Sequence, residues 1–269
     1  MNSPAAAGVR RWAVVGGLVG LIAGGLWSLP AAWLARGVAH ATQGLLVLAD
    51  ARGTVWSGSA VAVLSAGTDS RTAVALPGRL DWRLGWVDGA FELRASQPCC
   101  LRGEPRLRLR PGIGSWRFEL QPAAGTGAAA VIGQWPAAWL VGLGTPWNTL
   151  KLEGDLRLSS RGLLVDVAEG RWRLAGDAVL ELQRAASRLS TLPTLGSYRL
   201  NATATEAGAR LSLATLSGAL RLTGDGDWGA GGLRFRGEAS AEPGAEDALA
   251  NLLSIIGRRQ GARSIIAIG

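Results

Sequence analysis

The stretch from Trp12 to Ala35 contains no charged residue, and arginines flank it, with Arg10 and Arg11 before it and Arg36 after it. At about 1.5 Å per residue, a helix of this length crosses the roughly 30 Å hydrocarbon layer of a bilayer. Lipid leaves such a segment no backbone partner except its own helix, which strongly limits the structures it can adopt. The sequence therefore predicts a single N-terminal transmembrane helix.

The charges around this segment predict its orientation. The paired arginines before it favour a cytoplasmic N-terminus, although Arg36 and His40 weaken the asymmetry. The predicted division of the chain is residues 1–11 as a cytoplasmic N-terminus, 12–35 as the transmembrane helix, 36–44 as a linker and 45–269 as a periplasmic β-rich domain.

A cleaved secretory signal is the alternative interpretation of the same segment. Ala39-His40-Ala41 offers a small-x-small cleavage site. The apolar run is longer than the about 7 to 15 residues of a usual signal core, which favours retention. Pro30 is expected to end or kink the straight part of the helix. Either interpretation sends the rest of the chain across the membrane.

Downstream of the anchor, short segments of alternating apolar and polar residues recur between Gly, Pro, Asp or Ser residues. Connections such as Ser160-Arg161-Gly162 and Glu206-Ala207-Gly208 have hairpin lengths, which exclude parallel crossovers. The sequence therefore predicts a mainly β domain built as an antiparallel β-meander, whose sheet is open, curved or folded over. The predicted strands are residues 80–84, 91–94, 106–110, 116–120, 150–158, 163–167, 171–182, 198–205, 210–215, 219–224 and 233–239.

Two short helices are expected to interrupt this meander and to cap the sheet. The first runs from Pro136 to Leu143, with the proline at the first helical position. The second, Glu246 to Arg259, has leucines at helical spacing, acidic residues early and arginines late. The apolar face of the sheet must also be buried. The other half of the sheet, the two helices, a partner protein and lipid are all candidates, and the sequence does not choose among them.

The chain offers little for catalysis. His40, the sole histidine, lies in the predicted linker, which argues against a Ser/His/Asp or Cys/His apparatus. Asp225 and Asp227 lie in a glycine-rich stretch read as a turn, where carboxylates usually bond local backbone, and a calcium site there lacks further oxygen ligands. The glycine-rich pieces precede strands instead of helices, so no phosphate-binding loop is expected. We expect no enzymatic activity, no catalytic or metal site, no cofactor and no small-molecule substrate.

The net charge of +8 comes from arginines that are spread along the predicted strands and alternate with apolar residues. This pattern is typical of a solvated strand face, so no nucleic-acid partner is expected. Attraction to an acidic surface such as lipid headgroups is the functional alternative. The only cysteines, Cys99 and Cys100, are adjacent, and neighbours seldom bridge because their side chains diverge. A vicinal or intermolecular disulfide stays open as the alternative.

One short motif stands out beyond these patterns. The segment Gly53-Thr54-Val55-Trp56-Ser57-Gly58 places a tryptophan between two glycines, directly after the strand-like run Leu45 to Leu48. This composition suits a tight turn whose large ring covers the end of the sheet. By structural reasoning alone it is a packing motif.

The order of these features resembles the protein N family of the bacterial type II secretion system, which carries folded proteins across the outer membrane of Gram-negative bacteria. The resemblance covers residues 12 to 260 and is weakest from Cys99 to Thr149. The motifs that carry it are the N-terminal span and residues 53–58, 80–84, 195–200, 216–226, 233–239 and 257–259.

The resemblance implies a bitopic inner-membrane protein with a periplasmic β domain that assists the secretion machine without enzymatic activity. Its implied partners are the other subunits of the machine and membrane lipid. Gly53, Thr54, Trp56 and Gly58 are singled out as the family signature. The alternative function is a lipid-handling groove in the periplasm that bridges the inner and outer membranes, based on fold-level analogy.

Overall fold

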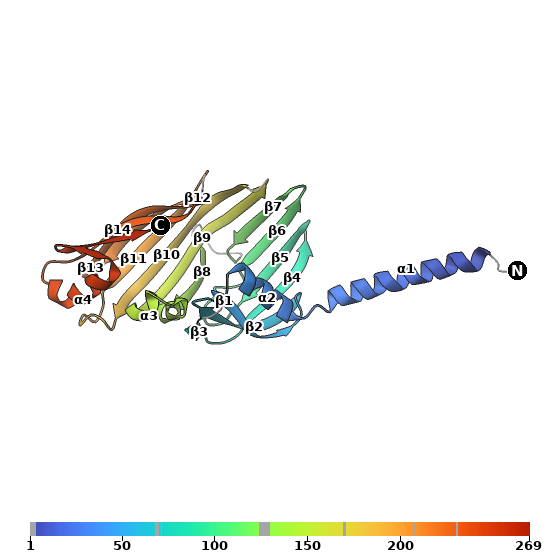
Figure 1. The fold of residues 1–269 in the computed structure, drawn as a ribbon, viewed down its shortest axis with the longest axis horizontal. Coiled ribbons are helices and arrows are strands. Elements are labelled where there is room, and N and C mark those ends of the chain that lie inside the picture. Colours follow the sequence, from blue (N-terminus) through green and yellow to red (C-terminus); the bar gives the residue numbers. More distant parts are fainter. Residues whose placement is uncertain are drawn as a thin grey trace.

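A single curved antiparallel sheet makes up most of the molecule, and a long N-terminal helix projects from one end of it (Figure 1). The structure is a computed structural model, which describes residues 4–67, 70, 72–123, 130–168, 171–206, 208–229 and 231–269. Sixteen strands join in this sheet. Their bounds are β1 Leu46–Gly53, β2 Ser57–Ser65, β3 Ala73–Ala75, β4 Leu80–Val87, β5 Ala90–Ser96, β6 Arg106–Gly112, β7 Ser115–Gln121, β8 Ala130–Pro136, β9 Leu152–Ala168, β10 Arg171–Ser187, β11 Gly196–Thr205, β12 Gly208–Ser217, β13 Leu220–Gly229, β14 Gly232–Ala241, β15 Arg258–Gln260 and β16 Arg263–Ile268.

The strands follow one another across the sheet almost in chain order. The path runs β1-β2-β4-β5-β6-β7-β9-β10-β11-β12-β13-β14-β16-β15, with β3 paired to β2 and β8 paired to β9. Every pairing is antiparallel, and short turns join most of the neighbours. The predicted antiparallel meander is confirmed, and its sheet is open and curved (Figure 1).

The expected helices are present with changed bounds. The first is a 3₁₀ helix, η1 (Ala137–Leu143), followed by the short α3 (Trp147–Leu150). The second is α4 (Glu246–Ile256). It ends before the predicted Arg259, because the extended Gly257 leads directly into β15. A Cβ at Gly257 would lie 2.4 Å from the Ile265 carbonyl oxygen, so this exit from the helix requires a glycine.

The predicted N-terminal helix over residues 12–35 is divided into two helices, α1 (Pro4–Trp27) and α2 (Ala31–Ala41). Pro30 separates them, because it adopts an extended conformation (φ −62°, ψ 145°) and has no amide hydrogen to continue the first helix. Ala31 is 1 % exposed in a cluster with Leu48 and Trp82, so α2 packs on the sheet. Within the described residues, no helix combines the length and the apolar content that a membrane crossing requires.

Two further segments differ from prediction. Ser160 to Gly162 does not join two strands, because β9 runs through it as one 17-residue strand. The Ser160 hydroxyl donates to the Asp177 carbonyl oxygen at 2.7 Å and accepts from the Gly162 amide at 3.0 Å, which forms a bulge in the ladder.

Residues 224–229 likewise form part of β13 and not a turn. Gly224 and Gly226 lie under the ring of Phe235 on β14, and a Cβ at Gly224 would approach that ring to 2.5 Å. Asp225 and Asp227 are therefore strand residues on the opposite face of the sheet.

The main hydrophobic core lies at one end of the concave face, under α4, η1 and α3 (Figure 1). Three leucines of α4 are at most 1 % exposed. They pack against strand residues such as Leu220 and Tyr198, whose hydroxyl donates to the Leu220 carbonyl oxygen at 3.0 Å. The helices thus bury part of the apolar face of the sheet. The α4 leucines are Leu249, Leu252 and Leu253.

Candidate functional site

One face of the sheet is apolar across most of its strands. Strand register places apolar residues opposite one another, because side chains at alternate positions share a face. The intervening positions carry charges, such as Glu92 opposite Arg108, and these point to the outer, convex face. One continuous line of paired inner-face residues is Phe91, Leu109, Phe118, Val165 and Leu174.

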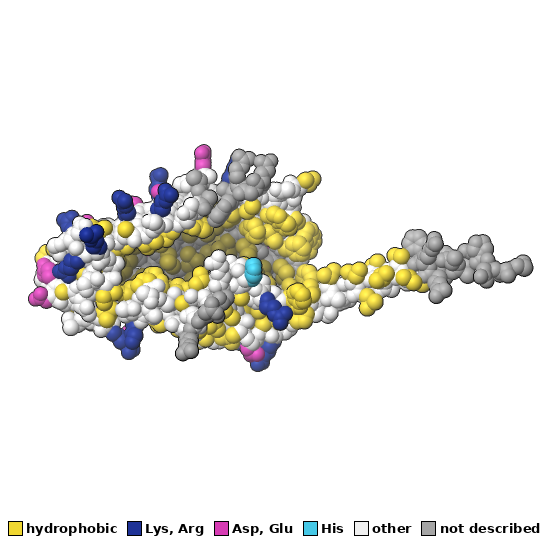
Figure 2. All heavy atoms as spheres, viewed as in Figure 1, with side chains coloured by type: hydrophobic (Ala, Val, Ile, Leu, Met, Phe, Trp, Pro, Cys, Tyr) yellow, Lys and Arg dark blue, Asp and Glu magenta, His cyan; other side chains and the backbone are white. Residues whose placement is uncertain are grey.

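The helices leave the other half of this face uncovered, where it forms a cavity of about 480 Å³. Figure 2 shows this hollow lined with apolar side chains, while the basic side chains lie on the outer surface. We name it the apolar trough. Its lining residues are Leu163, Val165, Leu174, Ala178, Ala202, Ala209, Leu211, Trp228 and Leu233.

Large apolar side chains are exposed near the hairpin turns of the sheet, and one of them, Trp228, belongs to the lining of the trough. Trp86 is 57 % exposed, Trp116 49 % and Trp228 41 %. Ile113, at the tip of the β6–β7 hairpin, is fully exposed. Large apolar side chains that are exposed together at one end of a sheet are typical of an interaction site.

The four signature residues meet in the turn between β1 and β2. The Thr54 amide donates to the Ser57 carbonyl oxygen at 2.9 Å, and the Thr54 hydroxyl accepts from the Ser57 amide at 3.1 Å. Gly53 has φ +89°, which disfavours any side chain. A Cβ at Gly58 would lie 2.5 Å from the Trp82 ring. Backbone conformation at Gly53 and lack of space at Gly58 therefore disfavour any other residue at these two positions.

Trp56 joins this turn to the N-terminal helix. Its indole nitrogen donates to the Leu26 carbonyl oxygen at 2.8 Å, and its ring stacks on Trp27 with the ring centroids 6.3 Å apart. The Val55 amide donates to the Leu29 carbonyl oxygen at 2.9 Å. The sequence predicted that the Trp56 ring covers the end of the sheet, but the ring packs on the end of α1. The signature is the joint between α1 and the sheet.

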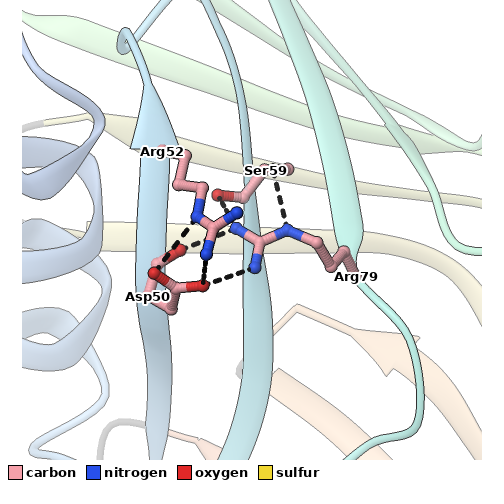
Figure 3. Close-up of polar contacts among 4 residues, drawn as sticks. All are labelled: Asp50, Arg52, Ser59 and Arg79. Atoms are coloured by element: carbon pink, nitrogen blue, oxygen red, sulfur yellow. Dashed lines mark hydrogen bonds and ion pairs between the residues drawn. The ribbon is translucent and has the colours of Figure 1, made fainter.

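A charged network on the neighbouring strands reinforces this joint (Figure 3). Arg79 donates to the Asp50 carboxylate at 2.7 Å and to the Ser59 hydroxyl at 3.0 Å, and Arg52 pairs with the same carboxylate at 2.8 Å. The hydrogen bonds from Arg79 and Arg52 hold the pKa of the Asp50 carboxyl below its ordinary value. Asp50 itself has φ +49° in a bulge of β1, so the network holds an irregular backbone in place.

A buried charge lies on the outer face of the sheet. Glu92 is 2 % exposed, and it accepts from Arg94 at 2.7 Å and Arg108 at 2.8 Å. Burial alone raises the pKa of this carboxyl, but the two arginines outweigh burial and the pKa lies below its ordinary value. Glu92 therefore stays ionised as a cross-strand tie between β5 and β6, with no open position for a substrate.

Cys99 and Cys100 form a disulfide with each other, contrary to the expectation that neighbours stay unbridged. They lie in the turn after β5, where Cys100 is buried against Ala62 and Leu76. His40 lies near the end of α2. Within the ranges described above, no three His, Cys, Asp or Glu residues are grouped as a metal site would need. The chemistry that these residues support is packing and binding.

Sequence reasoning identified the alternation of the strands but did not locate the trough. The spacing of the inner-face tryptophans held a usable signal. Trp86, Trp116 and Trp228 each lie within a few residues of a hairpin turn. Large rings repeated at the same end of successive strands indicate an aromatic rim rather than a closed core.

The family comparison covers the β body. Residues 44–266 match the family model described as type II secretion system (T2SS), protein N. Neither the curated proteins nor the solved structures contain a significant match to this chain. Because the family model spans well over half of the sequence, from the first strand to the last, the chain belongs to the type II secretion system protein N family.

Proposed function

We propose that this chain is a non-enzymatic inner-membrane component of the type II secretion system, which assists the assembly or function of the machine that exports folded proteins across the outer membrane. The observation that carries the proposal is the family match over residues 44–266. Membership implies interaction with other components of the system. The geometry agrees with this role, since the described residues offer binding surfaces and structural ties.

The proposed location is the inner membrane, with a single N-terminal anchor and the β body in the periplasm. The segment from Trp12 to Ala35 lacks charge, and arginines precede it. In the middle of α1, the side chains of Val14, Leu18 and Leu21 are 57 %, 54 % and 76 % exposed. Apolar side chains without a protein cover favour a lipid environment.

No described helix has by itself the length and the apolar content that a membrane crossing requires. Membrane insertion therefore needs a direct measurement. In native membranes, the chain should resist alkaline carbonate extraction. A C-terminal alkaline phosphatase fusion should be active, and an N-terminal fusion should be inactive. Release by carbonate, or the reverse activity pattern, would reject the proposed topology.

The secretion role is tested by deleting the gene in its native strain. We expect type II substrates to accumulate in the periplasm while general export across the inner membrane continues. A plasmid copy of the full chain should restore release into the medium. Unchanged secretion in the deletion strain would count heavily against the proposal.

A further inference from the structure

We propose that the apolar trough binds one acyl chain of an anionic phospholipid and holds the headgroup at its mouth. This inference goes beyond the secretion role and does not depend on it. It follows from the chemistry of the lining, the arrangement of the two ends and the charges at the rim.

The lining favours an acyl chain over a polypeptide. All nine lining residues are Leu, Val, Ala or Trp, and the sheet backbone beneath them is paired within the sheet. An extended peptide would leave its own amide and carbonyl groups without partners on such a surface. A helix about 10 Å wide satisfies its own backbone, but a cavity of about 480 Å³ would hold only about one turn of it. An acyl chain has no polar group to satisfy.

The trough has a closed end and an open end, which orients the ligand. At the closed end the cover is α4, whose Leu249, Leu252 and Leu253 are buried against the strands. At the open end Trp228, a lining residue close to the β13–β14 turn, is 41 % exposed, and Trp116 on β7, the strand next to β9, is 49 % exposed. Tryptophan rings favour the boundary between acyl chains and headgroups. The chain therefore points toward α4, and the headgroup lies at the hairpin tips.

The rim selects the charge of the headgroup. Arg110, Arg173 and Arg234 lie close to three different hairpin turns on the outer face, and all three are exposed. In the part of the chain that the structure describes, none of the three forms an ion pair. The carboxylates opposite Arg173 and Arg234 are Asp166 and Asp227, and they pair with other arginines, Arg117 and Arg210. Guanidinium groups bind phosphate through directed hydrogen bonds, so the three rim arginines complement an anionic headgroup.

The test uses the full chain in liposomes that contain phosphatidylglycerol with a photoactivatable diazirine in its acyl chain. After illumination, labelled peptides are located by mass spectrometry. We expect label on inner-face peptides of β9 to β13 as well as on α1, which serves as the internal reference. Label confined to α1 would overturn the proposal.

Two variants on β11 distinguish the effect of filling the trough from the effect of changing the outer face of the sheet. Ala202→Trp should fill the trough and lower its labelling at least about tenfold relative to α1. Thr203→Trp, its neighbour on the outer face, should change labelling by less than about twofold. Leu211→Ser adds a hydroxyl without added bulk and should also lower labelling severalfold. Circular dichroism melting checks that each variant is folded. Equal labelling in all folded variants would contradict the proposed site.

The headgroup is tested with a phosphatidylcholine probe that carries the same diazirine. Wild type should be labelled more strongly by phosphatidylglycerol, and replacing Arg110, Arg173 and Arg234 with Gln should remove this preference without abolishing labelling. Equal labelling by both probes in wild type would reject the anionic headgroup.

A photoreactive amino acid at position 211 in native membranes identifies the natural occupant. The expected adduct has the mass of a phospholipid, and a protein adduct would overturn the acyl-chain assignment. Secretion is not a readout in any of these experiments. A labelled trough in a strain whose secretion is unaffected by deletion would therefore leave this inference standing and reject the secretion role.

Discussion

At the joint between helix and sheet, single atoms determine how the two parts of the molecule meet. The Trp56 indole reaches the Leu26 carbonyl oxygen, and the Trp82 indole donates to the Val55 carbonyl oxygen at 3.1 Å. Gly58 lies against the Trp82 ring, where no side chain fits. The signature residues thus contribute hydrogen bonds and packing at the joint, and this role requires no catalytic group.

Replacing Trp56 with alanine should loosen α1 from the body. The variant loses one hydrogen bond and one ring stack, each about 1 kcal/mol, while the β1–β2 turn keeps its own backbone bonds. We expect faster proteolysis at Ser28 to Pro30, with little change in the melting of the sheet. Trp56→Phe keeps an aromatic ring but not the hydrogen bond, and should be intermediate. Equal cleavage rates in all three proteins would argue against the joint.

Gly58→Ala should destabilise the body by about 1–3 kcal/mol. The added methyl would lie 2.5 Å from both the Arg52 carbonyl oxygen and the Trp82 ring, so either backbone or core must move. Gly85→Ala is the matched control, because nothing lies within 4 Å of its Cβ position. The free energy of unfolding from denaturant titration should fall in the first variant only. A similar value for both variants would contradict the steric account.

The Asp50 network predicts a pH dependence of stability. Because the folded pKa of Asp50 lies below its unfolded value, its contribution is present above the unfolded pKa and is lost as pH falls through the folded pKa. The stability difference between wild type and Asp50→Asn should therefore be constant above about pH 5 and narrow as the pH falls below about 4. Thermal melts across this range measure it. A difference that is constant with pH would show that the carboxylate charge is not what holds the bulge.

At the scale of elements, period-two alternation was enough to predict most central strands and their antiparallel order. The prediction from alternation failed where the same residue types occur both in turns and inside strands. Ser160 and Gly162 suit a hairpin, but a hydrogen bond to the next strand makes them a bulge. Glycines at 224 and 226 suit a turn, but they make room for Phe235. Such outcomes depend on a neighbouring strand, which local composition does not contain.

The cap formed by α4 gives a prediction at this scale. Leu252 is 1 % exposed in the main core, so Leu252→Ala should cost about 2–5 kcal/mol of stability. Ile255, on the same helix, is 37 % exposed, and Ile255→Ala should cost less than about 1 kcal/mol. Chemical denaturation of the two variants measures both values. Equal losses would mean that α4 is not packed as described.

At the scale of the whole molecule, the sheet is wider than its helices can cover. The sequence predicted one apolar face and left its cover undecided among the other half of the sheet, the two helices, a partner protein and lipid. The structure buries one end of that face and leaves the trough open at the other. Which part of the apolar face stays open depends on the curvature of the sheet. That curvature depends on bulges and glycine contacts, which a pattern of apolar residues does not reveal.

We propose that the β body works in secretion only when its N-terminal helix holds it at the membrane. The direct measurement is the secreted fraction of a type II substrate in the native strain after residues 1–27 are replaced by a cleavable secretory signal. An unrelated membrane span in the same place is the control. We predict that the cleaved body accumulates in the periplasm and secretion falls to the level of the deletion strain, while the substituted span restores it. Secretion at the wild-type level with the freely released body would contradict the account.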